Sequence, residues 1–555
     1  MKRHALLLIA LVSLPAATIA DEPRPPAAAI ASAHPLATEA GHEILARGGN
    51  AFDAAIAVAA ALAVVEPYNS GLGGGGFFLL HRARDGFQVM IDARERAPLA
   101  ATRDMYLRDG RAVPALSIDG ALAAGIPGTP AALAHVAKKY GKLPLRDSLA
   151  PAIRFAGDGF RVTPHYSKML LRQHMRLQDN FPEAARVFHQ DGLIPAPGDV
   201  LRQPELARTL RRLAGNGHAG FYDGETAGRL VQGVREAGGI WTLKDLAGYR
   251  VVEREPVRGR YRGIRITSAA LPSSGGVVLN QVLNLLADLD LDAMPRARRD
   301  HAVIEAMRLA YRDRALLLGD PDFVRVDVTR LLDPAYAARL REEMRAPEPA
   351  PDVAPAGAAG GGANTTHFSI IDREGNRVAA TLSLNTPFGS GLMPPGTGVV
   401  LNNEMDDFSV KPGAPNTYGL VGGDANAIAP GKRPLSSMTP TFLESDKAVV
   451  VLGTPGGSRI ISMVLLATLE FAHGRGGPQE WVGLPRFHHQ YLPDVVTHES
   501  GAFSGDDAGK LQQYGHRLET VRGRYGNMQV VAWDKKDGKI EAASDPRGEG
   551  AAVVK

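Results

Sequence analysis

One segment of this 555-residue chain has too few large apolar side chains to join a folded core, and it runs directly into a predicted strand. Residues 346–363 consist mainly of Ala, Pro and Gly, which is typical of a flexible linker. From Thr365 the sequence reads TTHFSII, whose β-branched and aromatic residues favour a strand. A turn is expected at residues 373–376, and residues 377–384 return as a second strand. The chain therefore places a hydroxyl residue where a flexible leader meets the tip of a hairpin.

The expected hairpin brings polar side chains close to Thr365. If the turn is centred on residues 374–375, Thr365 lies opposite Leu384. Ser383 and Asn385 then flank that point on one face of the sheet. Thr365 would have hydrogen-bonding neighbours on the strand beside it.

A strand-tip threonine after a flexible leader suggests self-cleavage between Asn364 and Thr365. Cleavage would free an α-amine on the residue that also carries the hydroxyl. Such an amine, with a pKa near ~7.7–8, can act as general base for its own hydroxyl. An ordinary hairpin after a linker is the alternative interpretation of this segment.

Composition and charge exclude several other chemistries. The chain contains no cysteine, which rules out disulfides, thiolate nucleophiles and Cys–zinc sites. Its formal net charge is +4, and the sequence has no block of Lys and Arg. This distribution argues against a nucleic-acid partner.

The N-terminus is typical of an export signal. Residues 1–4 carry positive charge, residues 5–14 are apolar, and residues 15–20 end in small residues before Asp21. We predict a signal peptide over residues 1–20, because the apolar run is too short to span a bilayer. An uncleaved anchor is the alternative. No later segment is apolar enough for a spanning helix, so a periplasmic or secreted protein is expected.

Three features of the N-terminal half bear on the fold and on a site. Residues 51–65 are predicted to form a buried helix capped by Asn50. The glycines of residues 71–76 match G-x-G-x-x-G but follow a helix, so they favour a tight backbone passage over a dinucleotide site. Arg94 comes at a predicted strand end, where it can bind a ligand, a surface ion pair being the alternative.

Acidic and hydroxyl residues beyond the hairpin suggest charged recognition. Glu404 and Asp407 could hold an ammonium group, although a solvated turn would carry the same residues. Ser436 and Ser437 provide two adjacent hydroxyls.

A flexible loop and a glycine pair complete the candidate site. Residues 411–423 form a Pro/Gly-rich loop with one aromatic residue, Tyr418, which suits a lid. Gly456 and Gly457 offer consecutive N–H groups for an oxyanion. The adjacent residues His488 and His489 are predicted to be two surface histidines rather than metal ligands.

In this order, the motifs resemble the γ-glutamyltransferases (γ-glutamyltranspeptidases), which belong to the N-terminal-nucleophile hydrolases. The similarity extends from about residue 34 to residue 547. Its landmarks are residues 48–55, 73–77, 94–95, 124–128, 272–276, 365–367, 402–408, 434–438 and 455–459.

The resemblance implies an α+β fold, a four-layer αββα sandwich built jointly by two subunits of one precursor. The large subunit would comprise residues 21–364, including a flexible linker at 345–364, and the small catalytic subunit residues 365–555. The two would form a heterodimer. Neither a cofactor nor a catalytic metal is implied.

The resemblance also assigns roles to individual residues. Thr365 would be the nucleophile, Gly456 and Gly457 the oxyanion hole, and Tyr418 the aromatic residue of the lid. The substrate α-carboxylate would be bound by Arg94, Ser436 and Ser437, and its α-ammonium by Asn385, Glu404 and Asp407. Ser383 stands where the family usually has a threonine that hydrogen-bonds the nucleophile; it keeps the hydroxyl but loses the methyl that restricts the rotamer.

These roles imply transfer of a γ-glutamyl group from glutathione or another γ-glutamyl donor to water or to an amino-acid or dipeptide acceptor. The Thr365 amine would be the base, with a Thr365–His367 pair as a less favoured alternative. A glutaryl- or cephalosporin-type acylase on the same scaffold is the nearest rival, and Glu404 and Asp407 count against it. A catalytically silent binding protein is the second rival interpretation, and the intact nucleophile counts against it.

We predict that the chain processes itself into residues 21–364 and 365–555. Thr365→Ala should remain a single chain on a denaturing gel, because it removes the attacking hydroxyl. N-terminal sequencing of the smaller wild-type fragment should begin at Thr365, and any other start would contradict the assignment.

Overall fold

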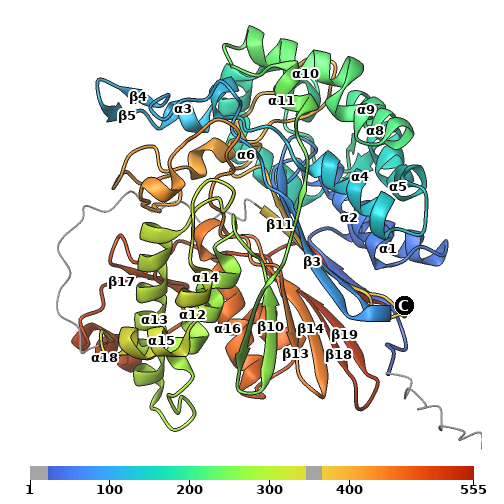
Figure 1. Ribbon diagram of the computed structural model, residues 1–555. Coiled ribbons are helices and arrows are strands. Elements are labelled where there is room, and N and C mark those ends of the chain that lie inside the picture. Colours follow the sequence, from blue (N-terminus) through green and yellow to red (C-terminus); the bar gives the residue numbers. More distant parts are fainter. Residues whose placement is uncertain (1–22, 345–364) are drawn as a thin grey trace, which may run out of the picture.

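The computed structural model describes residues 23–344 and 365–555 (Figure 1). The expected signal peptide at residues 1–20, the expected linker at residues 345–364 and Asn364 all lie outside the described residues.

Two large antiparallel sheets form the centre of the protein. The seven-stranded sheet has the order β20-β1-β11-β12-β2-β3-β8, and the six-stranded sheet β19-β18-β14-β13-β10-β9. The strands of the first are β1 (Ala29–Ser32), β2 (Gly75–Arg82), β3 (Phe87–Ala93), β8 (Val252–Arg254), β11 (Thr365–Ile371), β12 (Arg377–Ser383) and β20 (Ala551–Val554). Those of the second are β9 (Val257–Tyr261), β10 (Ile264–Ser268), β13 (Thr441–Glu444), β14 (Ala448–Gly453), β18 (Gln529–Asp534) and β19 (Ile540–Ser544). β11 contacts both β14 and β18, so this strand of the seven-stranded sheet packs against the six-stranded sheet.

Each sheet carries helices on its outer face, which confirms the expected α+β class (Figure 1). On the seven-stranded sheet these are α1 (Pro35–Ala46), α2 (Ala51–Val65), α4 (Thr129–Tyr140) and α5 (Leu145–Asp158). On the six-stranded sheet they are α12 (Gly275–Leu286), α13 (Arg296–Leu317) and α16 (Ile460–Ala472). Alternate residues along the strands divide between the two cores: Phe78 joins the first and Phe77 the second.

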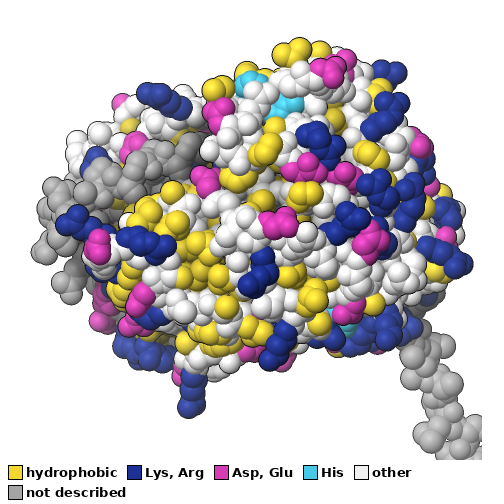
Figure 2. All heavy atoms as spheres, turned by 90° about the horizontal axis from the view of Figure 1, so that it is seen from above, with side chains coloured by type: hydrophobic (Ala, Val, Ile, Leu, Met, Phe, Trp, Pro, Cys, Tyr) yellow, Lys and Arg dark blue, Asp and Glu magenta, His cyan; other side chains and the backbone are white. Residues whose placement is uncertain are grey.

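The remaining helices and three small sheets lie outside the two large sheets. The remaining α-helices are α3 (Ala115–Ile118), α6 (Pro164–Asn180), α7 (Pro182–Phe188), α8 (Pro204–Asn216), α9 (Ala219–Tyr222), α10 (Gly224–Glu236), α11 (Leu243–Ala247), α14 (Val328–Leu331), α15 (Pro334–Arg341), α17 (Pro478–Gly483) and α18 (Gly505–Gln513). The small sheets comprise β4 (Leu107–Arg108) with β5 (Arg111–Ala112), β6 (Phe160–Arg161) with β7 (Val200–Leu201), and β15 (Phe487–His488) with β16 (Val496–His498) and β17 (Leu518–Thr520). Within the described ranges, no helix is long and apolar enough to cross a membrane. Figure 2 shows Lys and Arg side chains interspersed with Asp and Glu on the face that it displays.

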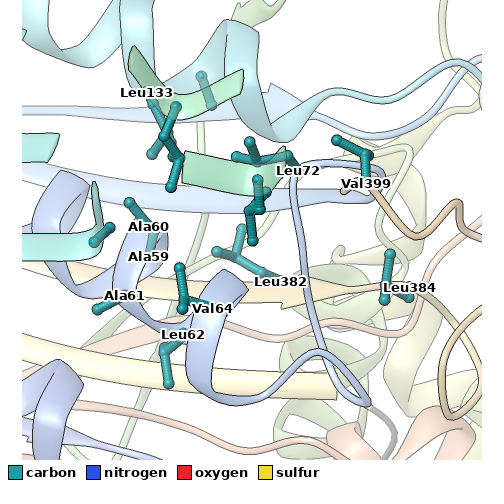
Figure 3. Close-up of a cluster of buried hydrophobic side chains, with 14 of the residues drawn as sticks. Ala59, Ala60, Ala61, Leu62, Val64, Leu72, Leu133, Leu382, Leu384 and Val399 are labelled. Atoms are coloured by element: carbon teal, nitrogen blue, oxygen red, sulfur yellow. The ribbon is translucent and has the colours of Figure 1, made fainter. Parts of the chain in front are cut away.

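Helix α2 is the buried helix that the sequence predicts. All of its residues are buried, and Asn50 caps it by accepting hydrogen bonds from Phe52 N and Asp53 N. Asp53 returns a bond to Asn50 N, which completes a capping box. Figure 3 shows Leu62 and Val64 in one cluster of buried side chains with Leu382 of β12. The helix therefore holds the hairpin from its outer side.

The hairpin register differs from the expected one by one residue. Thr365 pairs with Ser383, not with Leu384. The turn is a three-residue loop closed by Asp372 and Asn376, in which Gly375 has a φ of 87°. The Asp372 carboxylate accepts hydrogen bonds from Glu374 N and Asn376 N, which fixes this shorter loop. The shift puts Ser383 directly beside Thr365.

Residues 261–268 are strand-like in sequence, which predicts one strand there, but the structure has two. Residues 257–268 form a complete hairpin, β9 and β10, with Arg262 and Gly263 in its turn. Both turn residues have positive φ, 49° and 80°, as a type I′ turn requires. An arginine at the first of these positions hides the turn from a search for Asn-Gly or Asp-Gly.

The glycines at residues 73–76 form the predicted tight passage. A Cβ on Gly74 would lie 2.0 Å from the carbonyl oxygen of Ser383, and one on Gly73 would lie 1.9 Å from that of Val400. These two close approaches bring the glycine segment, the end of β12 and the segment around Val400 together beside Thr365. Only glycine allows them.

We expect Gly74→Ala to destabilise the protein by about 1–3 kcal/mol and to lower activity, because the added methyl group must displace Ser383. Thermal unfolding and steady-state kinetics measure both effects. Gly228→Ala, in α10, is the control: its Cβ meets nothing within 4 Å, so it should raise stability by about 0.5–1 kcal/mol. Equal melting temperatures for the two variants would contradict the tight passage.

Candidate active site

Thr365 is the first described residue of β11 and is buried beside Ser383. Its Oγ1 lies 3.2 Å from the Ser383 Oγ, within hydrogen-bond distance. Asn385 N donates to the same Ser383 Oγ at 2.7 Å. One lone pair of the Ser383 hydroxyl is thus occupied by a fixed donor, which orients the hydroxyl toward Thr365.

The same pocket brings together most of the residues singled out in the sequence. It is lined by Thr365, Ser383, Asn385, Glu404, Asp407, Tyr418, Ser436, Ser437 and Gly457. Arg94 and Gly456 are not part of its lining. Arg314, Met438 and Ser458 line it as well. Met438 and Ser458 belong to the motifs at residues 434–438 and 455–459, whereas no sequence motif indicates Arg314.

Gly456 and Gly457 form a strained turn between β14 and α16. Their φ values are 146° and 59°. A Cβ on Gly456 would lie 2.5 Å from Met463 Cε, and one on Gly457 would lie 2.4 Å from Tyr418 Cε1. Both positions therefore require glycine, and the turn keeps backbone at the pocket wall.

Arg94 follows β3 and lies under the pocket, with its guanidinium group fully buried. Its Nη1 donates to Glu404 Oε2 at 2.5 Å, and its Nη2 donates to Asp407 Oδ2 at 2.5 Å. Its Nε donates to the carbonyl of Pro434 at 3.1 Å. Arg94, a predicted carboxylate ligand, is thus paired in this structure with two of the three predicted ammonium ligands, Glu404 and Asp407.

A third carboxylate, Glu95, was not assigned a role from the sequence. It is completely buried, and one oxygen lies 3.6 Å from Arg94 Nη1. Burial raises its pKa to about 8, although Arg94 acts in the opposite direction. Burial likewise raises the pKa of Glu404. Three acids thus surround one arginine, and a cationic ligand group would favour the charged form of the acids whose pKa burial raises.

The loop at residues 411–423 closes over the pocket. Tyr418 lies against Gly457, and its hydroxyl donates to the carbonyl of Asn385 at 2.5 Å. Asn416 donates to Asp407 at 3.0 Å, and Thr417 N donates to Asp406 at 2.9 Å. The loop is thus fastened to the acidic segment by several hydrogen bonds.

His367 does not pair with Thr365. Its Nδ1 lies 2.8 Å from Thr381 Oγ1, and its Nε2 lies 3.1 Å from Ser369 Oγ. Complete burial lowers its pKa to about 3, so the ring stays neutral between the two sheets. This geometry disfavours the alternative in which His367 is the base.

The prediction of two surface histidines at residues 488–489 is wrong. Both are buried: His488 bonds to Ser462 and Gln490, and His489 bonds to Asp494. Side chains from α16 and the following loop cover them. In the described part of the chain, no group of three His, Cys, Asp or Glu side chains is placed to hold a metal ion.

Comparison with known proteins agrees with this architecture. The sequence model of the family described as gamma-glutamyltranspeptidase matches residues 37–555. The chain is 42% identical over 525 residues to the glutathione hydrolase proenzyme of Escherichia coli (strain K12), an alignment that covers 93% of this chain and 90% of the relative. It is 36% identical over 533 residues to the Acylase ACY 1 proenzyme of Pseudomonas sp. (strain V22), covering 94% and 92% of the two chains.

Solved structures give the same result. A cephalosporin acylase from Bacillus halodurans superposes with a TM-score of 0.84 at 29% identity, over 99% of each chain. The gamma-glutamyltranspeptidase of Helicobacter pylori superposes with a TM-score of 0.55 at 41% identity, over 58% of this chain and 92% of that one. Fold and relatives therefore define an enzyme of the hydrolase and acyl-transfer class. The chain belongs to the gamma-glutamyltranspeptidase family.

We expect Ser383→Ala to lower kcat by about 10- to 100-fold and to slow maturation, because a hydrogen bond of this kind contributes roughly 1.5–3 kcal/mol. Ser383→Thr keeps the hydroxyl and should match or exceed the wild type. Steady-state kinetics and a time course of processing measure both. Wild-type kinetics for Ser383→Ala would show that the 3.2 Å contact does not serve the nucleophile.

Proposed function

We propose that this enzyme is a self-processing γ-glutamyltransferase and glutathione hydrolase. The observation that carries the proposal is a single pocket in which Thr365 faces both an acidic pair and a pair of serine hydroxyls. A γ-glutamyl group bears an ammonium and a carboxylate on one carbon, at a distance from its scissile amide. The pocket offers a group of matching chemistry for each.

The proposed reaction begins with attack of the Thr365 hydroxyl on the γ-amide carbonyl. After cleavage from Asn364, the α-amine of Thr365 takes the hydroxyl proton and later delivers it to the leaving amine. N–H groups of Gly456 and Gly457 stabilise the tetrahedral oxyanion. The γ-glutamyl ester on Thr365 then passes to water, or to the amine of an amino acid or dipeptide.

The precursor organisation follows from the same proposal. Residues 21–364 form the large subunit and residues 365–555 the small one, after a signal peptide at residues 1–20 has directed export to the periplasm or the medium. Both subunits contribute strands to the seven-stranded sheet, which supports an obligate heterodimer. Two sheets in contact, each covered by helices, support a four-layer αββα sandwich.

Substrate recognition requires the buried ion pairs of Arg94 to rearrange or to be shared. Glu404 and Asp407 lie on the pocket wall and are available to an ammonium group. When a cation arrives, each carboxylate can keep one oxygen on Arg94 and direct the other to the ligand. Arg94 then steers the substrate carboxylate through the positive charge that it keeps.

A glutaryl- or cephalosporin-type acylase is the alternative, and the superposition on the Bacillus halodurans acylase favours it on fold alone. A glutaryl group lacks the amine, so an acylase has no need of two carboxylates at the pocket wall. Purified enzyme incubated with glutathione should release glutamate, and glycylglycine should divert part of it to a γ-glutamyl tripeptide. Preference for glutaryl-p-nitroanilide over γ-glutamyl-p-nitroanilide would overturn the proposal.

Specificity should rest on Asp407. We expect Asp407→Ala to lower kcat/KM for γ-glutamyl-p-nitroanilide by about 30- to 1000-fold, because the substrate ammonium loses its desolvated partner. Glutaryl-p-nitroanilide should be spared, whereas Arg94→Ala should impair both substrates. Kinetics with the two substrates measure the difference.

The control for this experiment is Asp424→Ala, which removes an exposed carboxylate paired with Arg103 and should change neither substrate. Equal losses on both substrates after Asp407→Ala would assign that residue to the fold or to the nucleophile instead of to the ammonium.

A further inference from the structure

The tip of β11 extends beyond one of its two neighbouring strands. β12 pairs with β11 along its whole length. β1, on the other side, ends at Ser32, which pairs with Phe368, so β1 does not reach residues 365–367. Thr365 therefore lies on an overhang that the described sheet pairs along one edge, and its position depends on contacts that side chains make above and below the sheet.

Thr366 makes such a contact on the helical side. Strand alternation turns it toward the face on which Phe368 packs with α2, whereas Thr365 faces the pocket. The Thr366 Oγ1 donates to Glu66 Oε2 at 2.9 Å. Glu66 is the C-cap residue of α2, and 1% of its surface is exposed. The residue after Thr365 is thus bonded to the end of a buried helix.

The segment that begins at Glu66 also holds the end of β12. Asn69 Nδ2 lies 3.4 Å from Glu66 Oε1, to which it donates, and the carbonyl of Asn69 accepts from Leu384 N at 3.2 Å. Leu384 directly follows Ser383, the partner of Thr365 in the hairpin. Residues 66–69 therefore fix both strands of the hairpin at its tip.

The partners of Glu66 among the described residues carry no positive charge. Thr366 and Asn69 are neutral, and the charged group that faces Glu66 is a second acid, Glu549. Burial raises the pKa of Glu66 to about 8, and the negative charge of Glu549 acts in the same direction. Glu66 therefore keeps its proton at neutral pH.

No other side chain around the two acids supplies a positive charge. Burial lowers the pKa of the histidines and raises the pKa of the tyrosines, so these groups are neutral at pH 7. The side chains concerned are His34, His165, Tyr68 and Tyr166.

A protonated Glu66 fits its surroundings. One oxygen accepts from Thr366, which leaves the other to donate a proton. Asn69 Oδ1 has no hydrogen-bond partner among the described residues, and it can accept that proton if the amide turns end for end. A glutamine at position 66 would offer the same acceptor and the same donor, but at every pH.

We propose that Glu66 is a positioning residue, which fixes the tip of β11 through Thr366 and thereby aims the hydroxyl of Thr365. This inference deepens the proposed function and rests on it. The neutral acid is the working form, because an ionised Glu66 would be a buried charge that faces Glu549, and the two would move apart. Glu66 does not line the pocket, so it acts on the chemistry and not on substrate binding.

The test begins with Thr366 in the matured enzyme, using γ-glutamyl-p-nitroanilide. Thr366→Val removes the hydroxyl at nearly equal volume and should lower kcat about 3- to 10-fold, with KM changed by less than about 2-fold. Thr366→Ser restores the hydroxyl and should restore kcat.

The pH profile of kcat provides a readout that a merely structural role would not change. In the wild type, kcat should fall as the pH rises past about 8, where Glu66 loses its proton. Glu66→Gln should retain kcat at pH 7 and should lack this alkaline fall. Its acid limb, which reports the α-amine of Thr365, should match that of the wild type.

A matched control is Glu255→Gln, which removes an exposed carboxylate paired with Arg258 and should leave the profile unchanged. If Thr366→Val fails to mature, the profile of Glu66→Gln decides the question. An alkaline fall that is the same in Glu66→Gln and the wild type, or a rise in KM without loss of kcat in Thr366→Val, would overturn the role of Glu66. A wild type that does not hydrolyse γ-glutamyl-p-nitroanilide, or a Thr365→Ala variant that does, would overturn the proposed function itself.

Discussion

The pairing of β11 with β12 is the contact on which the site depends. It places Thr365 opposite Ser383 in the middle of the seven-stranded sheet, between a buried helix on one side and the second sheet on the other. A one-residue change of register would turn every side chain of the hairpin to the opposite face. Asp372 prevents this by bonding to two backbone N–H groups of the turn.

The rest of the pocket is brought to the hairpin by close backbone contacts. Gly74 approaches the carbonyl of Ser383, and Gly73 approaches that of Val400. These contacts carry the segment that contains Glu404 and Asp407 to the end of β3, where Arg94 emerges. Glycine is required because a methyl group on either residue would overlap with backbone, which does not move easily.

The charges of the site are balanced unevenly. Arg94 is surrounded by Glu95, Glu404 and Asp407, so the acids outnumber the one cation that they pair with. The ammonium group of a substrate can share these carboxylates with Arg94, which is the electrostatic basis of the specificity proposed here.

The sequence by itself determined the features that arise from neighbouring residues. These include the hairpin that begins at Thr365, the capped helix at residues 51–65 and the glycine passage at residues 73–76, since propensity, capping and glycine's freedom act over a few positions. Tertiary structure decided the register of the hairpin, the burial of His488 and His489, and the pairing of Arg94 with acids more than 300 residues away. It also brought Arg314 of α13 to the wall of the pocket. No local pattern reveals these features, because each depends on residues far apart in the sequence that pack together.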